Sequence, residues 1–516
     1  MNHSAVALTI FLGIAQASGT VSGANVIDLN HQEQSSQRGA VLFPFDSYSI
    51  PFRHGLQLEL IQAKRYEGNP VLEPGGLGKV DTNAMAYYGT VIEIDGKLHM
   101  WYLGRGDVGD MPLRICYATS NDGFQWEKPN LGLVEYSGNS QNNLVDLDWD
   151  GKAMSCCVLY DPDDPDLERR FKIFSEVESP TSKHQGCVAF SPDGLRWTTS
   201  PHNPVTHVRI EPTGIIRKSG CYYVVGQNAG FDRGFQKRVL ISLASYDFEH
   251  WTDASVLGFR RDAIPPSPVV FGHNMGKQVH LGAGLWDRGN AILGLYGQWN
   301  ASNETDDRRE MRMDIGLVVS QDAVHYREPI PDFRLIDTTE EGWKGPNPLG
   351  DPPRFAQGQG IVNIGDKTIT WYSIWGRGGD NSIRAAYWKR DRLGYFSPTR
   401  TPIEGQAWVD EVKPHFISAP IRIGSGSTRI FVNASGLSEH SQITVEVLNE
   451  RFEKLDGYTD ADFIPWSDDS SVRLPVRWQR GAVITGISEP IRIRVNWDGL
   501  RLEDARVYAV YVEMAE

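Results

Sequence analysis

Short apolar segments that alternate with tight turns run along most of the chain, and long stretches with helical periodicity are scarce. In "YYGTVIEIDGKLHMWYLG" (87–104), an apolar strand leads through a turn at Gly96 into an aromatic-rich strand. A third strand follows, such as "LRICYATS" (113–120). Comparable segments lie at 156–175, 213–227, 283–299 and 360–375. The pattern predicts repeated antiparallel units of about four strands each.

A phrase containing Ser, Asp and Trp closes the units. It reads "SNDGFQW" at 120–126, "SPDGLRW" at 191–197 and "SYDFEHW" at 245–251, with weaker copies at 320–326 and 389–395. Repetition at this spacing is typical of a propeller or a solenoid, and antiparallel units favour the propeller. Asp suits a tight turn because its side chain bonds nearby backbone N–H groups. The phrase is therefore interpreted as scaffold, and the fold class as an all-β, five-bladed β-propeller.

The pattern changes after Gly405. The segments "STRIFVNASG" (427–436) and "IRIRVNWDG" (491–499) alternate apolar and polar residues, as the strands of a β-sandwich do. Near the other end of the chain, "AVLF" (40–43) is expected to close the ring against the fifth blade. The predicted domains are a signal peptide at 1–24, the propeller at 25–405 and a C-terminal β-sandwich at 406–516.

An apolar run near the N-terminus predicts export. It extends from Ala5 to Ala15 and ends in the small-residue motif "AQA" (15–17), which is typical of a signal-peptide cleavage site. The run has no Lys or Arg before it, and this leaves a buried N-terminal segment as the alternative. No other apolar stretch of the sequence is long enough to span a bilayer. We predict a secreted or periplasmic protein without a membrane partner.

Composition and charge limit the classes of molecule that the protein is expected to bind. The chain of 516 residues carries a formal net charge of −14, which disfavours nucleic acid as a partner. Its five cysteines have no regular spacing and predict buried free thiols, although a bridge from Cys156 or Cys157 to Cys187 is left open. No spacing of His, Cys and Asp matches a metal site, so neither a metal nor another cofactor is expected. The sequence does not indicate an oligomeric state.

The hairpin glycines locate the start of each inner strand, where the blades of a propeller meet at one rim of the central channel. Counting nine residues back from Gly96, Gly220, Gly289 and Gly365 gives Tyr87, Glu211, His280 and Ala356. Glu211 is the only carboxylate among these positions. A carboxyl group placed there among other acids is expected to have a raised pKa, whereas the alternative is a solvated Glu in a loop.

The segment "IEPTGIIRKSGCYYVVGQ" (210–227) has a Glu that heads a strand, followed by Gly-x-Tyr-Tyr. It resembles the third-blade segment of five-bladed glycoside hydrolases of the invertase/levanase and arabinanase/β-xylosidase type. In architecture the resemblance covers roughly residues 65–516. It implies three carboxylates at inner-strand starts, which act as base or nucleophile, as transition-state stabiliser and as general acid, and it assigns the acid to Glu211.

The other two carboxylates are less well defined. In blade one the counted position holds Tyr87, where the resemblance calls for Asp, so Asp81 is the candidate, with a turn or capping role as its alternative. In blade two Asp150 is the candidate, although Asp-Gly is also a common turn signal. Should Glu211 not be the acid, Glu176 or Glu178 is the replacement.

Polar and aromatic residues at the same rim are candidates for holding sugar hydroxyls or stacking on a sugar ring. They are Tyr87, Arg105, Gln227, Asn228, His280, Gln298, Trp299, Gln357, Trp375 and Arg377. The resemblance implies a secreted, exo-acting glycoside hydrolase with an oligo- or polysaccharide substrate. A glycoside phosphorylase and a non-catalytic carbohydrate- or protein-binding propeller are the alternatives, and the departure at Tyr87 favours the binding module.

Overall fold

The regular secondary structure of the described residues is almost entirely β-strand, and the all-β class is confirmed. The computed structural model describes residues 26–29, 39–107, 113–147, 149, 151–178, 185–228, 237–262, 274–338, 354–374, 381–399, 412–423, 426–467 and 469–515. Within these ranges the helical elements are short 3-10 turns, and none is long and apolar enough to cross a membrane. The predicted signal peptide at 1–24 lies outside the described residues.

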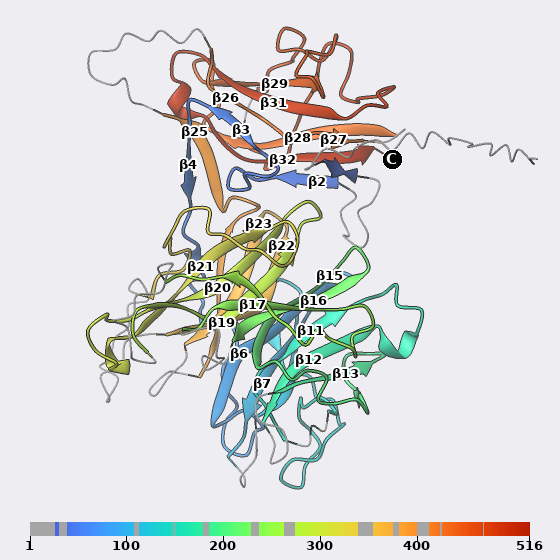
Figure 1. Ribbon diagram of the computed structural model, residues 1–516, viewed down its shortest axis with the longest axis vertical. Helices are drawn as coiled ribbons and strands as arrows, with labels where there is room; N and C mark the ends of the chain where they lie inside the picture. The colour runs from blue at the N-terminus through green and yellow to red at the C-terminus, as the bar shows by residue number, and fades with distance from the viewer. Residues whose placement is uncertain are drawn as a thin grey trace, which may run out of the picture.

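Antiparallel units follow one another along the first three quarters of the chain (Figure 1). The first unit contains β6 (Ala84–Ile94), β7 (Lys97–Arg105), β8 (Arg114–Ser120) and β9 (Trp126–Glu127). The second contains β10 (Lys152–Ala153), β11 (Cys157–Tyr160), β12 (Phe171–Glu178), β13 (Gln185–Ser191) and β14 (Thr198–Thr199). The third contains β15 (Ile210–Lys218), β16 (Cys221–Asn228), β17 (Leu240–Ser245) and β18 (Val256–Phe259).

Two further units complete this part of the fold. The fourth contains β19 (Lys277–Asp287), β20 (Ile292–Asn300) and β21 (Arg312–Ser320). The last contains β22 (Phe355–Ile364), β23 (Lys367–Ile374), β24 (Ile383–Lys389) and β5 (Lys64–Arg65). Because β5 comes from the N-terminal side of the first unit and pairs with β24 of the last, it joins the beginning of the series to its end.

The inner strands β6, β15, β19 and β22 crowd around a common axis. Their close approach requires glycine, because a Cβ on Gly284 would lie 2.1 Å from the carbonyl oxygen of Gly358. A Cβ on Gly358 would in turn lie 2.2 Å from the carbonyl oxygen of Gly89. Across the axis, the Gln359 side chain donates to the backbone carbonyl of Ile215 at 2.9 Å and accepts from its backbone N–H. This pair forms a crossbar in the channel.

The repeated phrase forms the predicted turn. Asp122 Oδ1 accepts hydrogen bonds from the backbone N–H groups of Phe124 and Gln125, and the Trp126 indole donates to the Gly123 carbonyl. The same pattern recurs at Asp193, Asp247 and Asp322. The scaffold interpretation is therefore confirmed for these four copies.

Two six-stranded sheets contain the C-terminal strands and lie together at one end of the molecule (Figure 1). One comprises β1 (Ile27–Asp28), β27 (Ile421–Arg422), β31 (Ile491–Asp498), β26 (His415–Ile417), β3 (Phe52–His54) and β29 (Gln442–Asn449). The other comprises β30 (Leu474–Pro475), β28 (Ser427–Ser435), β32 (Arg506–Ala515), β25 (Gly394–Pro398), β4 (Leu56–Leu60) and β2 (Gly39–Leu42). An apolar cluster that includes Phe416, Val445, Trp497 and Val510 fills the space between them.

The N-terminal strands correct one expectation. The "AVLF" segment does not close the ring, because β2 pairs with β32, and β5 makes the closure in its place. Strands β1, β3 and β4 also pair with C-terminal strands. A strand such as "STRIFVNASG" in a small sheet would leave its apolar face exposed to water. The N-terminal strands extend both sheets, and the wider sheets cover that face.

A buried polar network links the two parts of the molecule. Arg288 of the fourth unit forms an ion pair with Asp391, and the Tyr511 hydroxyl on β32 donates to the same carboxylate at 2.9 Å. Asp391 belongs to the weakest copy of the repeated phrase, in which the Ser is replaced by Lys389. Elsewhere in the fold the five cysteines are buried and unpaired, as predicted.

Candidate active site

Two glutamates from neighbouring units meet at the rim where the inner strands begin. Glu211 stands near the start of β15, pairs in register with Gln227 and remains partly accessible to solvent. Glu176 lies within β12, pairs in register with Gly186 and is only 2% exposed. It is an acidic residue at a buried position of the strand "FKIFSEVE". The two carboxyl groups are close enough to influence each other's ionisation.

The environment keeps Glu176 protonated at neutral pH. Burial raises the pKa of its carboxyl to about 9, and the charges of Glu211 and Glu178 act in the same direction. The cations of Arg209 and Lys152 oppose this shift without reversing it. A carboxylic acid that is protonated at neutral pH can donate a proton to a substrate.

The neighbours of Glu211 favour its ionised form, in contrast to those of Glu176. Burial also raises the pKa of Glu211, but the Arg238 guanidinium and a hydrogen bond from Gln227 lower it again. The Gln227 side chain is fixed because its Oε1 accepts the Leu281 N–H at 2.9 Å. These partners favour the ionised form of Glu211, so a single proton shared by the pair resides mainly on Glu176.

Arg238 is held rigidly at this rim. Its guanidinium lies 4.3 Å from the centroid of the Trp299 ring, and its Nη1 donates to Gln278 Oε1 at 3.2 Å. The backbone N–H of Arg238 donates to the same oxygen at 3.1 Å. His280 also packs against Trp299, and the centroids of the two rings lie 5.2 Å apart. Sequence reasoning missed Arg238 because no motif in the sequence around it marks the residue.

Two hydroxyl groups complete the polar cluster. Tyr88 on β6 is 8% exposed, and the ionisation of its phenol is affected by Glu211 and Glu176. Thr213 on β15 is buried and lies beside it. Within the described residues neither hydroxyl reaches a partner with full hydrogen-bond geometry. The counting rule passed Tyr88 by one residue and reached the adjacent Tyr87 instead.

Asp81 is held within the fold by partners of the first unit, and its catalytic role stays a prediction. The side chain is 1% exposed and forms an ion pair with Lys128. Its carboxylate also accepts from the Tyr102 hydroxyl at 2.8 Å and from the Gly75 N–H at 2.9 Å. All its polar capacity is used within the fold, so it stabilises the entry to the first unit.

Several predicted substrate-binding residues also prove structural. Tyr87 is fully buried, and its hydroxyl donates to the Gln359 carbonyl at 3.0 Å. Adjacent residues of a strand point to opposite sides, so Tyr87 points away from the side that its neighbour Tyr88 faces. Gln357 donates to the carbonyls of His280 and Gly282, which tie β22 to β19. A sugar cannot reach these side chains without a change in the inner strands.

The remaining rim residues fall into three groups. Gln298 and Trp299 are fully buried, and they donate to the carbonyls of Phe333 and Asn274, respectively. Asn228 is also buried, and its side chain accepts from the Val239 N–H. Three residues stay at the site end, namely Gln227 beside Glu211, His280 against Trp299, and Arg105, exposed at the end of β7. Asp150, Trp375 and Arg377 lie outside the described residues.

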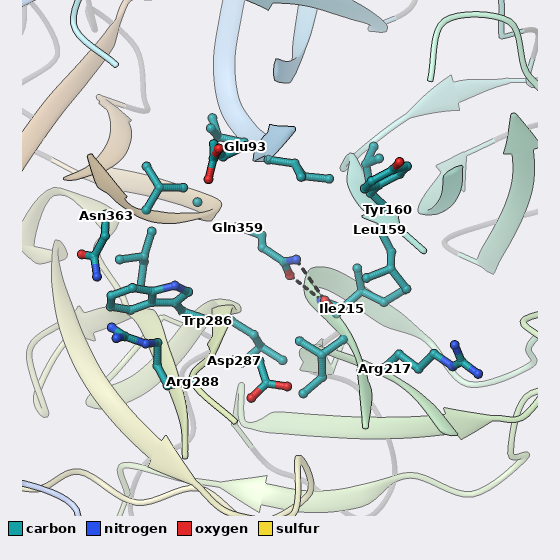
Figure 2. A pocket seen from close by; sticks show the side chains of 18 of the residues that line it. Glu93, Leu159, Tyr160, Ile215, Arg217, Trp286, Asp287, Arg288, Gln359 and Asn363 are labelled. Atoms are coloured by element: carbon teal, nitrogen blue, oxygen red, sulfur yellow. Dashed lines mark hydrogen bonds between the residues drawn. The ribbon is translucent and has the colours of Figure 1, made fainter. Parts of the chain in front are cut away.

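The hairpin end of the channel contains a cavity of about 470 Å³. Figure 2 shows Glu93 and Asp287 on different sides of it, with the Gln359 crossbar between them. Each carboxylate is bound by the backbone of its own turn, Glu93 by the Gly96 N–H at 3.0 Å and Asp287 by the Gly289 N–H at 2.8 Å. These acids serve as turn caps, which separates them from the pair at the other end.

Among the described residues, no three or more His, Cys, Asp or Glu side chains are placed to hold a metal ion. The cations nearest the glutamate pair are side chains, namely Arg238, Arg209 and Lys152. The arrangement can supply one protonated and one ionised carboxyl to a bound molecule. That combination suits acid–base chemistry at an ether-type or acetal oxygen.

No protein-family model matches the chain, and no curated protein matches its sequence. Among solved structures it is similar to a glycosyl hydrolase from Bacteroides ovatus, at 15% identity and a TM-score of 0.45, over 65% of this chain and 95% of that one. It is also similar to a fructofuranosidase from Schwanniomyces occidentalis, at 12% identity and a TM-score of 0.39, over 89% and 100%.

A third similar structure is a β-1,2-mannobiose phosphorylase from Listeria innocua, at 14% identity and a TM-score of 0.43, over 64% of this chain and 97% of that one. The group of enzymes that the sequence resembles thus recurs among these structures. At such identities and scores the likeness concerns the general fold and carries no information on the reaction of this chain.

Proposed function

We propose that the protein is a secreted glycoside hydrolase that cleaves an oligo- or polysaccharide from one end of the sugar chain. We interpret the antiparallel units as a five-bladed β-propeller and the two six-stranded sheets as a β-sandwich. The observation that carries the proposal is the pair Glu176 and Glu211, two carboxyl groups with raised pKa values at one rim, of which only one is favoured in the ionised form. Glycosidic bond cleavage needs this combination.

In the proposed reaction Glu176 is the general acid. Its proton passes to the glycosidic oxygen as the bond from that oxygen to the anomeric carbon breaks, and the bonding electrons stay on the leaving oxygen. The Glu211 carboxylate stabilises the positive charge that develops on the sugar. A water molecule then adds to the anomeric carbon, giving its hydroxyl to the product and its other proton back to Glu176. The resemblance assigned the acid to Glu211, but Arg238 and Gln227 favour an ionised Glu211, so we exchange the two roles.

The crossbar supports action at a chain end. Gln359 and Ile215 span the channel from two different units, beyond the glutamate pair. A sugar chain that enters at the rim cannot thread through the channel and must end there. A site closed on one side binds the terminal sugar of a chain in preference to an internal one.

The test begins with purified protein on a panel of polysaccharides and aryl glycosides, followed by two isosteric variants. On a substrate with a sugar leaving group, Glu176→Gln and Glu211→Gln should each lower turnover by about 10²–10⁴-fold. On a substrate with an activated aryl leaving group, Glu176→Gln should lose much less, because that leaving group needs little protonation. Equal losses for both variants on both substrates would contradict the assignment of the acid. Hydrolysis by neither variant and none by the wild type would contradict the proposed function.

Export is a separate part of the proposal, and it rests on the apolar run from Ala5 to Ala15 and the motif after it. Sequencing the N-terminus of the mature protein recovered from outside the cytoplasm tests it. A mature start shortly after residue 17 agrees with cleavage of the predicted signal peptide. An intact N-terminus on a cytoplasmic protein would refute it.

A further inference from the structure

The Tyr88 hydroxyl is an unusual group for a folded interior. Buried polar groups nearly always have a hydrogen-bond partner, since leaving one without a partner destabilises the folded state. Tyr88 is 8% exposed, yet its hydroxyl interacts with the Thr213 hydroxyl without full hydrogen-bond geometry and reaches no better partner among the described residues. The Thr213 hydroxyl next to it is 1% exposed and in the same situation.

The Tyr88 hydroxyl lies close to the glutamate pair. The backbone carbonyl of Tyr88 accepts the Cys156 N–H at 3.0 Å, which ties the residue to the second unit. Glu211 and Glu176, from the third and second units, both act on its phenol. Tyr88 therefore comes from the first unit to the point where the second and third units place their carboxyls. This is the unit in which Asp81 is held by Lys128, away from the rim.

We propose that Tyr88 is a third catalytic residue of this site, whose hydroxyl donates a hydrogen bond to a substrate oxygen held between Glu176 and Glu211. This inference rests on the proposed function and adds a group that neither the resemblance nor the counting rule includes. The hydroxyl of Thr213 is the second donor or acceptor available to the same bound sugar. The substrate class is a saccharide with a free hydroxyl or ring oxygen next to the bond that is cleaved.

The electrostatics select the donor role over a nucleophilic one. Burial raises the pKa of the Tyr88 phenol well above its ordinary value, and the charge of Glu211 raises it further. The phenol therefore keeps its proton throughout the working range of an enzyme. A protonated phenol donates a hydrogen bond, whereas a nucleophilic role would require the phenolate.

The central variant is Tyr88→Phe, and its control is Tyr117→Phe. Tyr117 is 6% exposed, like Tyr88, but its hydroxyl contacts His99 on β7 instead of the site. On an aryl glycoside that the wild type hydrolyses, Tyr88→Phe should lower kcat/KM by about 10- to 100-fold. Tyr117→Phe should remain within about twofold of the wild type.

Two readouts separate this role from a structural one. Tyr88→Phe removes a hydroxyl that makes no hydrogen bond of full geometry, so its Tm should change little, whereas Tyr117→Phe should lower the Tm. In an infrared pH titration of the buried carboxyls, Tyr88→Phe should move the midpoint of the pair upward, because the phenol dipole no longer stabilises the carboxylate. Tyr117→Phe should leave this midpoint unchanged.

The outcomes distinguish the two proposals. Wild-type kcat/KM in Tyr88→Phe, or an unchanged carboxyl titration, would overturn the inference while the hydrolase proposal stands. A loss of activity that is matched by a large loss of Tm would also overturn it, since it would show a structural role. If the wild type cleaves no glycoside but the titration midpoint moves as expected, Tyr88 remains the donor of this site and the proposed function alone fails.

Discussion

The two ends of the central channel both contain a pair of acidic side chains, but they use them in opposite ways. At the hairpin end, Glu93 and Asp287 are bound by the backbone of their own turns. At the rim, Glu176 and Glu211 lie between neighbouring units and influence each other's ionisation. A carboxylate that its own turn satisfies belongs to the scaffold. Carboxyls that meet across units and share a proton are available for chemistry.

The largest expected difference is in turnover when matched neutral variants are made at the two ends. Glu211→Gln should reduce hydrolysis by about 10²–10⁴-fold, because the ionised carboxylate is lost. Asp287→Asn keeps an oxygen acceptor for the Gly289 N–H and should stay within about twofold of the wild type. Initial rates on the same saccharide measure both. Comparable losses in the two variants would remove the distinction between the ends.

The next largest effect concerns the network beyond the hairpin end. Asp391→Asn leaves the buried Arg288 without its counter-ion, which typically destabilises a protein by about 3–5 kcal/mol. Asp366→Asn breaks only an exposed pair with Lys367 and should cost at most about 1 kcal/mol. Thermal and denaturant unfolding measure both variants. A mild effect of Asp391→Asn would show that this end contributes little to stability.

A pH-dependent effect is expected at the site. The pKa of Glu176 is raised from 4.5 to about 9, so the folded protein binds this proton more tightly than the unfolded chain does. The stability linked to that proton is fully present below pH 4.5 and is lost as the pH rises toward 9, by at most about 1.4 kcal/mol per pH unit. Glu176→Gln removes this loss.

Unfolding experiments between pH 5 and pH 9 test this expectation. Glu176→Gln should gain stability over the wild type as the pH increases, whereas the exposed Asp366→Asn should follow the pH dependence of the wild type. The rate of hydrolysis by the wild type should also fall as the pH approaches about 9, where Glu176 loses its proton. A constant stability difference across the range would argue against a buried, protonated Glu176.

The smallest effect belongs to the crossbar between the two ends. Gln359→Met removes two hydrogen bonds to Ile215 and should lower stability by about 1–3 kcal/mol. Turnover at the rim should change little, since Gln359 does not contact the glutamate pair in the described structure. Product analysis by chain length checks the exo assignment in the same variant. Release of internal fragments by Gln359→Met would show that the crossbar sets the chain-end preference.

The sequence by itself determined the local architecture of this protein. Period-two apolar patterns and hairpin glycines predicted the antiparallel units, because strand geometry is set by neighbouring residues. The Asp of the repeated phrase predicted turns that the structure confirms at Asp122, Asp193, Asp247 and Asp322. Counting from Gly220 also placed Glu211 at the rim, since β15 runs nearly without interruption between them.

Only the tertiary structure decided which acids share a site. Asp81 lies in sequence as close to the first inner strand as a catalytic residue would, but Lys128 and Tyr102 hold it inside the fold. Glu176 and Tyr88 come from other units than Glu211 and meet it only when the strands pack around one axis. Burial and the charge of a neighbour across units determine a pKa, and neither can be read from positions along the chain.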